Sequence, residues 1–253
     1  MLYQTLPRPT IFAHRGSKAH APENTLAAFK LAVSQGAPAI ELDVKLSSDG
    51  EVIVFHDQML NRTTNGSGAV GNLPLAALKE LDAGSHFSAA FKGEKIPTLS
   101  EVFETVGQHV FINVELTNYA SPRDALPDKV AALVKKFGLH DRIMFSSFNH
   151  ITLQRAHQLL PQVPLGLLAP PGILGVIARS WIGRRWVTYQ AIHPEVRDTS
   201  PRLIRNAQQR GHRVHVYTVN QPQDMLRLFQ AGVDGIFTDD PPLAFSVLNE
   251  IEK

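Results

Sequence analysis

The feature that most limits the fold of this chain is a regular alternation of short apolar runs with segments of helical periodicity. Eight apolar runs recur along the 253 residues, and the side chains at their ends are His14, Glu41, Glu115, Ser146, Leu168, His193, Tyr217 and Thr238. Helical periodicity falls between them at 25–34, 99–106, 126–137, 151–160, 173–181, 201–210 and 222–230. This alternation predicts parallel βα units, and eight units close into a TIM (β/α)8 barrel.

The longest step along the chain, from Glu41 to Glu115, contains a ninth apolar run. This run, residues 51–55, follows residues 44–48 through Asp49-Gly50, a dipeptide favoured in tight hairpin turns. We therefore expect the second barrel strand to continue past the rim and fold back as an antiparallel hairpin. A ninth parallel strand would require a crossover helix, for which the few residues of the turn leave no room.

The fold-back has two consequences. It delivers His56 and Asp57 close to Glu41 and Asp43, and it leaves residues from about 58 to 97 as a small insertion over the mouth of the barrel. Because α/β barrels commonly use about 250 residues as one domain, we expect residues 1–253 to form a single domain.

Composition excludes several classes of protein. With 43% hydrophobic and 19% charged residues the chain can bury a large core, and its formal charge of +2 is spread along the sequence, which argues against nucleic acid as a partner. The absence of cysteine excludes thiol nucleophiles and thiolate metal sites. Residues 1–11 contain no apolar segment of signal-peptide length, and no apolar run approaches the roughly 18 residues of a membrane span. We therefore expect a cytoplasmic protein without stable membrane insertion.

Three carboxylates are candidate metal ligands. Glu41 and Asp43 lie two apart in a strand, so that their side chains leave the same face, and Glu115 ends the next barrel strand. A lone pair of this spacing is more often a solvated surface feature, but the third carboxylate and the neighbouring histidines outweigh that interpretation. Ligation by oxygen alone favours Mg²⁺ or Ca²⁺ over Zn²⁺.

Two histidines and an arginine are candidate catalytic and phosphate-binding residues. His14 follows the first apolar run and His56 follows the fold-back, and two imidazoles can divide the acid and base roles of phosphodiester cleavage. Arg15 offers a planar cation for phosphate oxygens. The alternatives are a purely structural His14 and a salt bridge from Arg15 to Glu23 or Glu41.

Other polar residues are expected to have structural roles. Residues 21–25 are typical of a helix start, with capping as their default role. Among the remaining histidines, His193 is a candidate mouth residue and His215 is expected to pack in the interior. The others are predicted at the surface: His20, His86, His109, His140, His150, His157 and His212.

Taken together, the motifs resemble those of the glycerophosphodiester phosphodiesterases over nearly the whole chain. The matching segments are Ala13-His14-Arg15-Gly16, Ala21-Pro22-Glu23-Asn24-Thr25, Glu41-Leu42-Asp43-Val44, Phe55-His56-Asp57, Ile96-Pro97-Thr98-Leu99, Asn113-Val114-Glu115, Ser146-Ser147-Phe148, Tyr217-Thr218-Val219-Asn220 and Gly232-Val233-Asp234-Gly235-Ile236-Phe237-Thr238-Asp239. The resemblance implies a TIM barrel with an insertion after the second strand. It also implies metal-dependent hydrolysis of substrates such as glycerophosphocholine or glycerophosphoethanolamine to sn-glycerol 3-phosphate and an alcohol.

The resemblance further implies a role for each site residue. His14 and His56 would be the acid/base pair, Arg15 would bind the phosphate, and Phe148 and Tyr217 would contact substrate. Glu41, Asp43 and Glu115 would hold the divalent cation, Mg²⁺ or Ca²⁺.

Two positions depart from the family pattern. Glu115-Leu116-Thr117 stands where family members usually have Glu-x-Lys, so that a cation expected near the phosphate is missing. Either Arg15 and the metal suffice, or phosphate affinity or substrate choice has shifted. Tyr217 stands where the family often has Trp, which keeps an aromatic wall and adds a hydroxyl.

Several questions stay open at the level of sequence. The attacking oxygen is either water or the glycerol 2-hydroxyl, and either histidine can be the acid. Residues 170–186, with apolar residues, two Trp and three Arg, favour either an outer barrel helix or an interfacial segment serving a lysophospholipase D-like activity on acylated substrates. The missing lysine also leaves room for a non-catalytic phosphoester-binding barrel. Head-group preference and the choice between monomer and homodimer are not encoded in any recognisable pattern.

Overall fold

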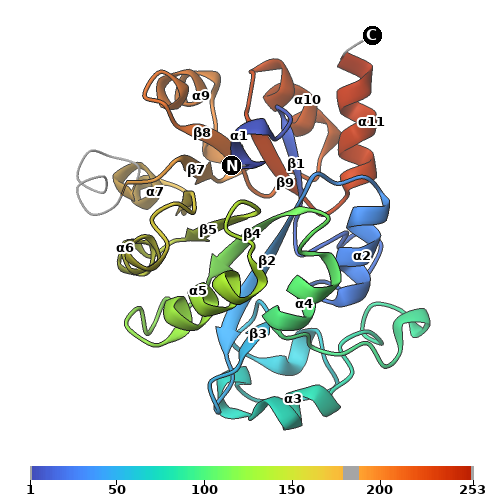
Figure 1. Ribbon diagram of the computed structural model, residues 1–253. Coiled ribbons are helices and arrows are strands. Elements are labelled where there is room, and N and C mark those ends of the chain that lie inside the picture. The colour runs from blue at the N-terminus through green and yellow to red at the C-terminus, as the bar shows by residue number, and fades with distance from the viewer. Residues whose placement is uncertain (1, 179–187, 252–253) are drawn as a thin grey trace.

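The computed structural model describes residues 2–178 and 188–251 (Figure 1). Within them, eight parallel strands form a closed ring, because β1 pairs with both β2 and β9. In ring order the strands are β1 (Thr10–Ala13), β2 (Ala39–Leu46), β4 (Phe111–Leu116), β5 (Ile143–Ser147), β6 (Leu165–Ala169), β7 (Ala191–Pro194), β8 (Arg213–Val216) and β9 (Gly235–Thr238). The predicted TIM barrel is confirmed.

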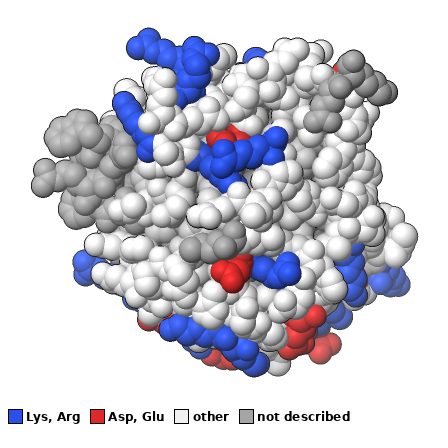
Figure 2. Space-filling view, turned by 45° about the horizontal axis from the view of Figure 1, so that its top comes forward, with Lys and Arg blue, Asp and Glu red and all other residues white. Residues whose placement is uncertain are grey.

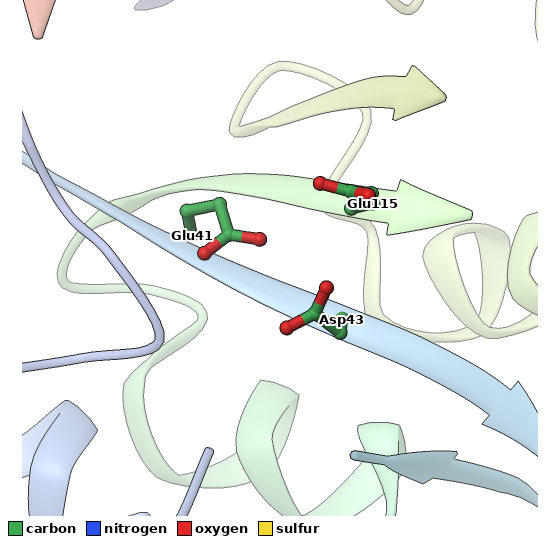
Figure 3. A group of neighbouring side chains, drawn as sticks. All are labelled: Glu41, Asp43 and Glu115. Atoms are coloured by element: carbon green, nitrogen blue, oxygen red, sulfur yellow. The ribbon is translucent and has the colours of Figure 1, made fainter. Parts of the chain in front are cut away.

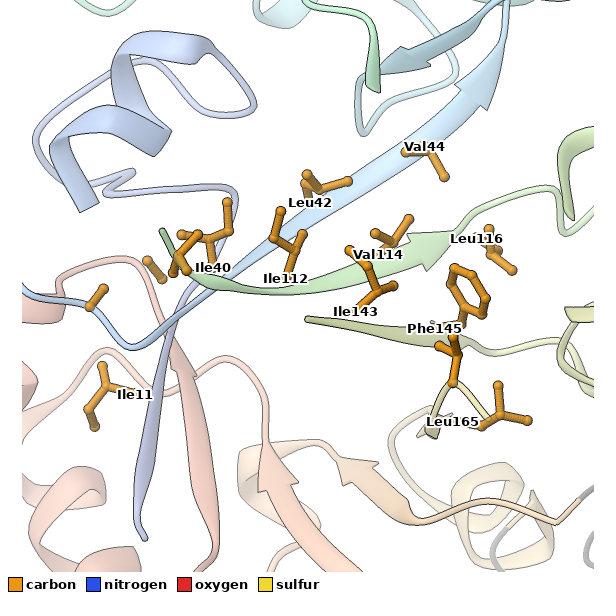
Figure 4. Packing of buried hydrophobic residues seen from close by; sticks show 14 of the residues in the cluster. Ile11, Ile40, Leu42, Val44, Ile112, Val114, Leu116, Ile143, Phe145 and Leu165 are labelled. Atoms are coloured by element: carbon orange, nitrogen blue, oxygen red, sulfur yellow. The ribbon is translucent and has the colours of Figure 1, made fainter. Parts of the chain in front are cut away.

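Helices surround the ring on its outer face (Figure 1). They are α2 (Leu26–Ser34), α4 (Leu99–Val106), α5 (Leu126–Phe137), α6 (His150–Leu159), α7 (Ile173–Ala178), α9 (Pro201–Gln208), α10 (Pro222–Gln230) and α11 (Pro241–Ile251). Alternate strand residues such as Ile40, Leu42 and Val44 belong to the continuous apolar core (Figure 4). Because strand side chains alternate between faces, the intervening Glu41 and Asp43 are directed to the barrel interior.

A short N-terminal helix, α1 (Leu2–Thr5), closes the end of the barrel at which the strands begin. Tyr3 and Leu6 pack in one buried cluster with Phe12, Phe111 and Phe237 of the interior. This cluster fills the barrel interior at the end where the strands begin. The polar side chains of a barrel active site are therefore expected at the opposite end, where the strands finish. Neither α1 nor α11 was predicted from sequence.

The fold-back hairpin is present as predicted. Strand β3 (Val52–Val54) pairs antiparallel with the end of β2, and the turn between them uses Gly50 at a φ of +81°. The insertion that follows contains three 3-10 turns and one helix: η1 (Leu60–Arg62), η2 (Val70–Asn72), α3 (Leu75–Glu80) and η3 (Ala89–Phe91). It packs around a small core of its own, which includes Ile53, Leu60 and Leu78.

Two predicted elements differ from the structure. The strand expected from 187 to 192 begins only at Ala191, so that His193 lies inside β7 instead of beyond its end. The helix expected over 173–181 is observed to Ala178, and its remainder lies outside the described residues, together with the Trp and Arg side chains at 179–186. An apolar run alone does not fix where a strand starts.

No helix in the described part of the chain is both long and apolar enough to cross a membrane. On the face drawn in Figure 2, Lys and Arg side chains stand in separate groups instead of one continuous basic patch. This distribution agrees with the spread of charge along the sequence.

Candidate active site

Polar side chains gather around a cavity at the end of the barrel where the strands finish. The cavity has a volume of about 210 Å³. Its lining comes from both the barrel and the fold-back: His14, Arg15, Glu41, Asp43, His56, Asn113, Glu115, Phe148, Leu168, His193, Tyr217, Thr218 and Phe237. All eight site residues predicted from sequence therefore line one cavity.

Glu41, Asp43 and Glu115 point toward one another between β2 and β4 (Figure 3). One carboxylate oxygen from each can be chosen so that all lie within 4.8 Å of one another. Parallel pairing of Asp43 with Glu115 produces this convergence, because the paired residues face the same side of the sheet. The arrangement brings three acidic groups into a space that one ion can span.

The electrostatics of this acidic cluster fit a divalent cation. Burial, reinforced by Asp43, raises the pKa of Glu115 to about 8, and burial likewise raises that of Glu41 well above its usual value. Burial alone would also raise the pKa of Asp43, but Arg15 beside it reverses the shift and lowers it. Oxygen Oε1 of Glu41 is buried without a hydrogen-bond partner. Buried carboxylates that repel one another are costly unless a cation joins them, and an all-oxygen set suits Mg²⁺ or Ca²⁺.

Neighbouring side chains hold the acidic cluster in place. The Asn24 side chain donates a 2.9 Å hydrogen bond to Oδ2 of Asp43, and the Tyr119 hydroxyl donates to Oε1 of Glu115. The backbone N–H of Arg15 donates to Oε2 of Glu41 at 2.9 Å. Each carboxylate thus has at least one anchor, and other oxygens remain available for a ligand.

His14 lies at the end of β1 with a side chain only 14% exposed. Its Nδ1 is 2.6 Å from Oδ1 of Asp239, and its Nε2 is 4.0 Å from Oε2 of Glu41. A carboxylate partner on Nδ1 favours the tautomer with the proton there, which leaves Nε2 toward the acidic cluster. Burial lowers the pKa of His14, although the hydrogen bond to Asp239 opposes this effect.

His56 lies beyond the end of β3, and its side chain is 41% exposed. Its Nδ1 is 2.6 Å from Oδ1 of Asp57, so that this imidazole too has a carboxylate behind it. Arg62 of the insertion donates to both oxygens of Asp57, at 2.7 and 3.0 Å. The hydrogen bonds from Arg62 and His56 lower the pKa of Asp57 to about 2 despite some desolvation.

Arg62 also binds the first loop of the barrel. It donates two hydrogen bonds to Glu23, at 2.8 and 2.7 Å, and Glu23 accepts a third, also 2.8 Å long, from Arg15. Desolvation would raise the pKa of Glu23, but the two guanidinium groups lower it far below its usual value. One carboxylate therefore ties the fold-back and insertion to the loop that follows β1.

Arg15 has structural partners as well as a place in the cavity. In addition to Glu23, its Nε lies 3.2 Å from Oδ2 of Asp43. Its φ of +55° is in the left-handed region, and Gly16 follows at +84°, where an added Cβ would lie 2.7 Å from Ala28 on α2. The loop after β1 is thus held in a strained, tightly packed path that aims Arg15 at the acidic cluster.

The interpretation of residues 21–25 as helix capping is correct only for Thr25, whose side chain accepts a hydrogen bond from the N–H of Ala28 at the start of α2. Glu23 and Asn24 face the site instead, and Asn24 adopts a φ of +56°, which Asn tolerates better than most residues. Their sequence pattern predicted capping alone, because helix caps and ion-pair partners use the same residue types.

Aromatic side chains form one edge of the cavity. Phe148 contacts Tyr217 and Tyr119 edge to face, with ring centroids 6.0 and 5.7 Å apart. The Tyr217 hydroxyl donates to the backbone oxygen of Ala169 at 2.8 Å. Tyr119 was not identified from sequence, since it lies in a loop after β4 with no periodic signal.

The two interior histidines behave differently from the catalytic candidates. His193 lines the cavity floor as expected, and His215 is buried among aromatic rings, also as expected. Nδ1 of His215 and Nε2 of His193 are 3.2 Å apart. Burial lowers the pKa of His193 to about 3. Burial is also the main cause that lowers the pKa of His215. Burial therefore favours the neutral form of both imidazoles.

A positively charged group lies beside Thr117, the second residue after Glu115. Thr117 is uncharged, but the Lys45 ammonium from the neighbouring strand β2 donates a 2.7 Å hydrogen bond to its hydroxyl. The uncharged Thr117 therefore has a buried ammonium group as its neighbour in the folded chain. The signal was present in the alternation of Glu41, Asp43 and Lys45 along one strand face.

The chain is similar to known proteins in both sequence and structure. A model of the glycerophosphoryl diester phosphodiesterase family matches residues 14–243. A glycerophosphodiester phosphodiesterase of Caldanaerobacter subterraneus subsp. tengcongensis is 38% identical over 244 residues, which cover 96% of this chain and 98% of the relative. The structure of an Oleispira antarctica phosphodiesterase in complex with the product sn-glycerol-3-phosphate has a TM-score of 0.88 at 33% identity, over 98% of each chain. A glycerophosphodiester phosphodiesterase structure from Agrobacterium tumefaciens has a TM-score of 0.78 at 31% identity, over 94% of this chain and 99% of that one.

Proposed function

The chain belongs to the glycerophosphoryl diester phosphodiesterase family, a family of phosphoric diester hydrolases, and from this premise we propose that it hydrolyses glycerophosphodiesters in a metal-dependent reaction. The products would be sn-glycerol 3-phosphate and an alcohol, with glycerophosphocholine and glycerophosphoethanolamine as representative substrates. The observation that supports this most strongly is the convergence of two carboxylate-backed imidazoles and three carboxylates on one cavity.

Glu41, Asp43 and Glu115 would hold the divalent cation, Mg²⁺ or Ca²⁺. When bound, such an ion supplies positive charge that stabilises the phosphoryl oxygens in the transition state. The three side chains are fixed before the ion arrives, because each is anchored by Asn24, Tyr119 or the Arg15 backbone.

His14 and His56 would act as the acid/base pair. Each imidazole has Nδ1 engaged by a carboxylate, Asp239 or Asp57, so that each Nε2 is free to accept or donate a proton in the cavity. One takes a proton from the attacking oxygen and the other gives a proton to the leaving alcohol oxygen. Two such groups from different segments can flank a phosphorus atom between them.

Arg15, Phe148 and Tyr217 would bind the substrate. The Arg15 guanidinium stands beside the acidic cluster, where it can donate to a phosphoryl oxygen while keeping its bond to Glu23. The two aromatic rings form an apolar wall for the carbon atoms of the glycerol or alcohol part.

The direct test is release of sn-glycerol 3-phosphate from glycerophosphocholine with and without a chelator. We expect turnover that a chelator abolishes and that Mg²⁺ or Ca²⁺ restores. Glu115→Gln should lose the response to metal, whereas Glu104→Gln, an exposed residue of α4 outside the cavity, should keep it. No release at any metal concentration would contradict the proposal and favour a phosphoester-binding barrel.

A second candidate activity is lysophospholipase D-like cleavage of acylated substrates. The specific observation in its favour is α7, which follows the cavity strand β6 and has four apolar side chains exposed to solvent by half or more: Ile173, Leu174, Val176 and Ile177. Such a surface can contact an acyl chain. The comparison of turnover on lysophosphatidylcholine and glycerophosphocholine decides between the two, and equal or greater turnover on the first would favour this candidate.

A further inference from the structure

The side chain of Lys45 belongs to the same strand face as the acidic cluster. Residues 41, 43 and 45 of β2 alternate with the apolar positions of the core, so that their side chains leave the strand on one side. Across the ladder, Asp43 pairs with Glu115, and the next residues on that side are Lys45 and Thr117. The register therefore places an ammonium group one step beyond the carboxylates.

Lys45 is buried, and the described hydrogen bond of its ammonium goes to a hydroxyl group instead of a carboxylate. Its residue is 8% exposed, and among the described residues the hydroxyl of Thr117 is its one hydrogen-bond partner. An ammonium has three N–H donors, so two remain unused. A buried charge without a paired carboxylate is costly, which indicates that another anion satisfies it when the site is filled.

Thr117 is built to hold this ammonium. Its own hydroxyl donates to the backbone oxygen of Val44 at 2.8 Å, so that an oxygen lone pair is turned toward Lys45. Burial lowers the pKa of Lys45, and Asp43, Glu115 and Asp57 are the charged groups that oppose this effect most. Two of them, Asp43 and Glu115, line the cavity in which cleavage is proposed.

The cavity itself is poor in cationic groups. Arg15 is the one Lys or Arg in its described lining, and its guanidinium is already engaged by Glu23 and Asp43. A phosphodiester anion entering beside three carboxylates would therefore gain from a second protein cation.

Lys45 lines a separate, smaller hollow of about 180 Å³. Tyr119 lines this hollow too, and its hydroxyl contacts Glu115. The four-carbon stem of lysine lets its ammonium exchange the Thr117 hydroxyl for an oxygen near Glu115 without movement of the backbone.

We propose that Lys45, presented by Thr117, binds a phosphoryl oxygen of the substrate as a second cation beside Arg15. This inference rests on the proposed phosphodiesterase function and names a further substrate-binding residue for it, with Thr117 as its positioning residue. The role depends on the positive charge and the reach of the side chain.

The test compares four variants with the wild type: Lys45→Met, Lys45→Arg, Lys45→Met with Thr117→Lys, and Lys129→Met as a control for loss of one lysine outside the cavity. Three quantities are measured: kcat/KM on glycerophosphocholine, the Kd of sn-glycerol 3-phosphate at fixed Mg²⁺, and the Kd of Mg²⁺ alone. Thermal unfolding reports whether each variant is folded.

We expect Lys45→Met to weaken product affinity and kcat/KM about 10- to 100-fold, the effect of losing one hydrogen bond to a charged group. Lys45→Arg should retain most of both, and the double variant should recover them, because Thr117→Lys restores an ammonium on the neighbouring strand. Mg²⁺ should bind Lys45→Met at least as tightly as wild type, since a positive charge beside its ligands has been removed.

Three results would overturn the inference. The first is a folded Lys45→Met variant that keeps product affinity and kcat/KM. The second is weaker binding of both Mg²⁺ and product, as expected of a structural defect. The third is a double variant that recovers nothing. An inactive wild-type protein would instead contradict the proposed function itself.

Discussion

His14 and His56 perform complementary roles in the proposed reaction, but the protein holds them in different ways. His14 ends a barrel strand, is largely buried, and is backed by Asp239 at the end of the last strand. His56 ends a fold-back strand, is 41% exposed, and is backed by Asp57, whose other partner is Arg62 of the insertion. One imidazole is fixed by the closed sheet, and the other by an ion-pair network at the surface.

This difference shows how a barrel can gain a catalytic group that its own strands do not supply. The sheet fixes the proposed metal ligands and one imidazole, because the paired strands leave little freedom. The half of the site that comes from the fold-back, His56 with Asp57, depends on Arg62. Arg62 bridges Asp57 and Glu23, and it thereby joins this fold-back half to the half that the barrel strands supply. The Arg62 side chain is 49% exposed, so its ion pairs are partly screened by salt, and this half is the more easily perturbed.

The largest expected effect comes from removing either imidazole. His14→Ala and His56→Ala should each lower turnover about 10²- to 10⁴-fold, because proton transfer by a positioned group contributes that much. Circular dichroism and thermal unfolding should confirm that both variants are folded. A variant with turnover close to wild type would remove that histidine from the acid/base role.

A substrate with a better leaving group sharpens the comparison between the two histidines. A nitrophenyl phosphodiester needs little protonation of its leaving oxygen, so the variant that lacks the acid should lose much less activity on it than on glycerophosphocholine. The variant that lacks the base should lose the same factor on both substrates. Equal losses by both variants on both substrates would contradict a division of labour.

Disconnecting the two halves should have an intermediate effect. Arg62→Gln removes the bridge between Asp57 and Glu23, and we expect kcat/KM to fall about 10- to 100-fold, since small displacements of a catalytic group are costly. The Kd of Mg²⁺ should stay unchanged, because the barrel half is intact.

Asn24→Ala should show the opposite pattern, with weaker Mg²⁺ binding from the loss of its bond to Asp43. Identical profiles for the two variants would contradict the separation into halves.

Metal binding should stabilise the protein in a pH-dependent way. A carboxyl group whose pKa is higher in the folded protein than in the unfolded chain stabilises the fold at pH values below its unfolded-state pKa. This contribution is lost as the pH rises through the folded-state pKa. For Glu115 in the metal-free protein, this stabilisation is lost between pH 4.5 and about pH 8. The gain in Tm on adding Mg²⁺ over chelator should therefore grow from pH 5 to pH 8, and it should be absent in Glu115→Gln. A hundredfold excess over Kd corresponds to about 2.7 kcal/mol.

The smallest expected effect is the stability contributed by the surface network. Arg62→Gln should lower the free energy of unfolding by about 1 kcal/mol or less at low salt, and by less still at 0.5 M salt. Chemical unfolding at the two salt concentrations checks this. A larger loss that does not respond to salt would mean that Arg62 is a core residue of the insertion.

Sequence patterns could predict the barrel half because its residues occur at strand ends. Glu41, Asp43 and Glu115 are separated by spacings that a parallel sheet converts directly into proximity. The turn at Asp49-Gly50 likewise fixed the position of His56. Periodicity and turn chemistry thus suffice wherever backbone geometry alone decides which residues meet.

The partners of these residues were harder to predict. Asp239 contacts His14 across 225 residues of sequence, and Arg62 reaches Glu23 from the 3-10 turn η1, which has no periodic sequence pattern. Such contacts depend on the three-dimensional path of the chain and on long side chains. The pairing of Lys45 with Thr117 was accessible in principle, since alternation along β2 continues past Asp43.

The most direct test of this account is anomalous diffraction from crystals grown with Mn²⁺ and sn-glycerol 3-phosphate. We predict one metal peak bounded by Glu41, Asp43 and Glu115, with the Nε2 atoms of His14 and His56 on either side of the phosphate. A metal peak elsewhere, or a His56 imidazole directed away from the phosphate, would contradict the claim that the fold-back completes the site.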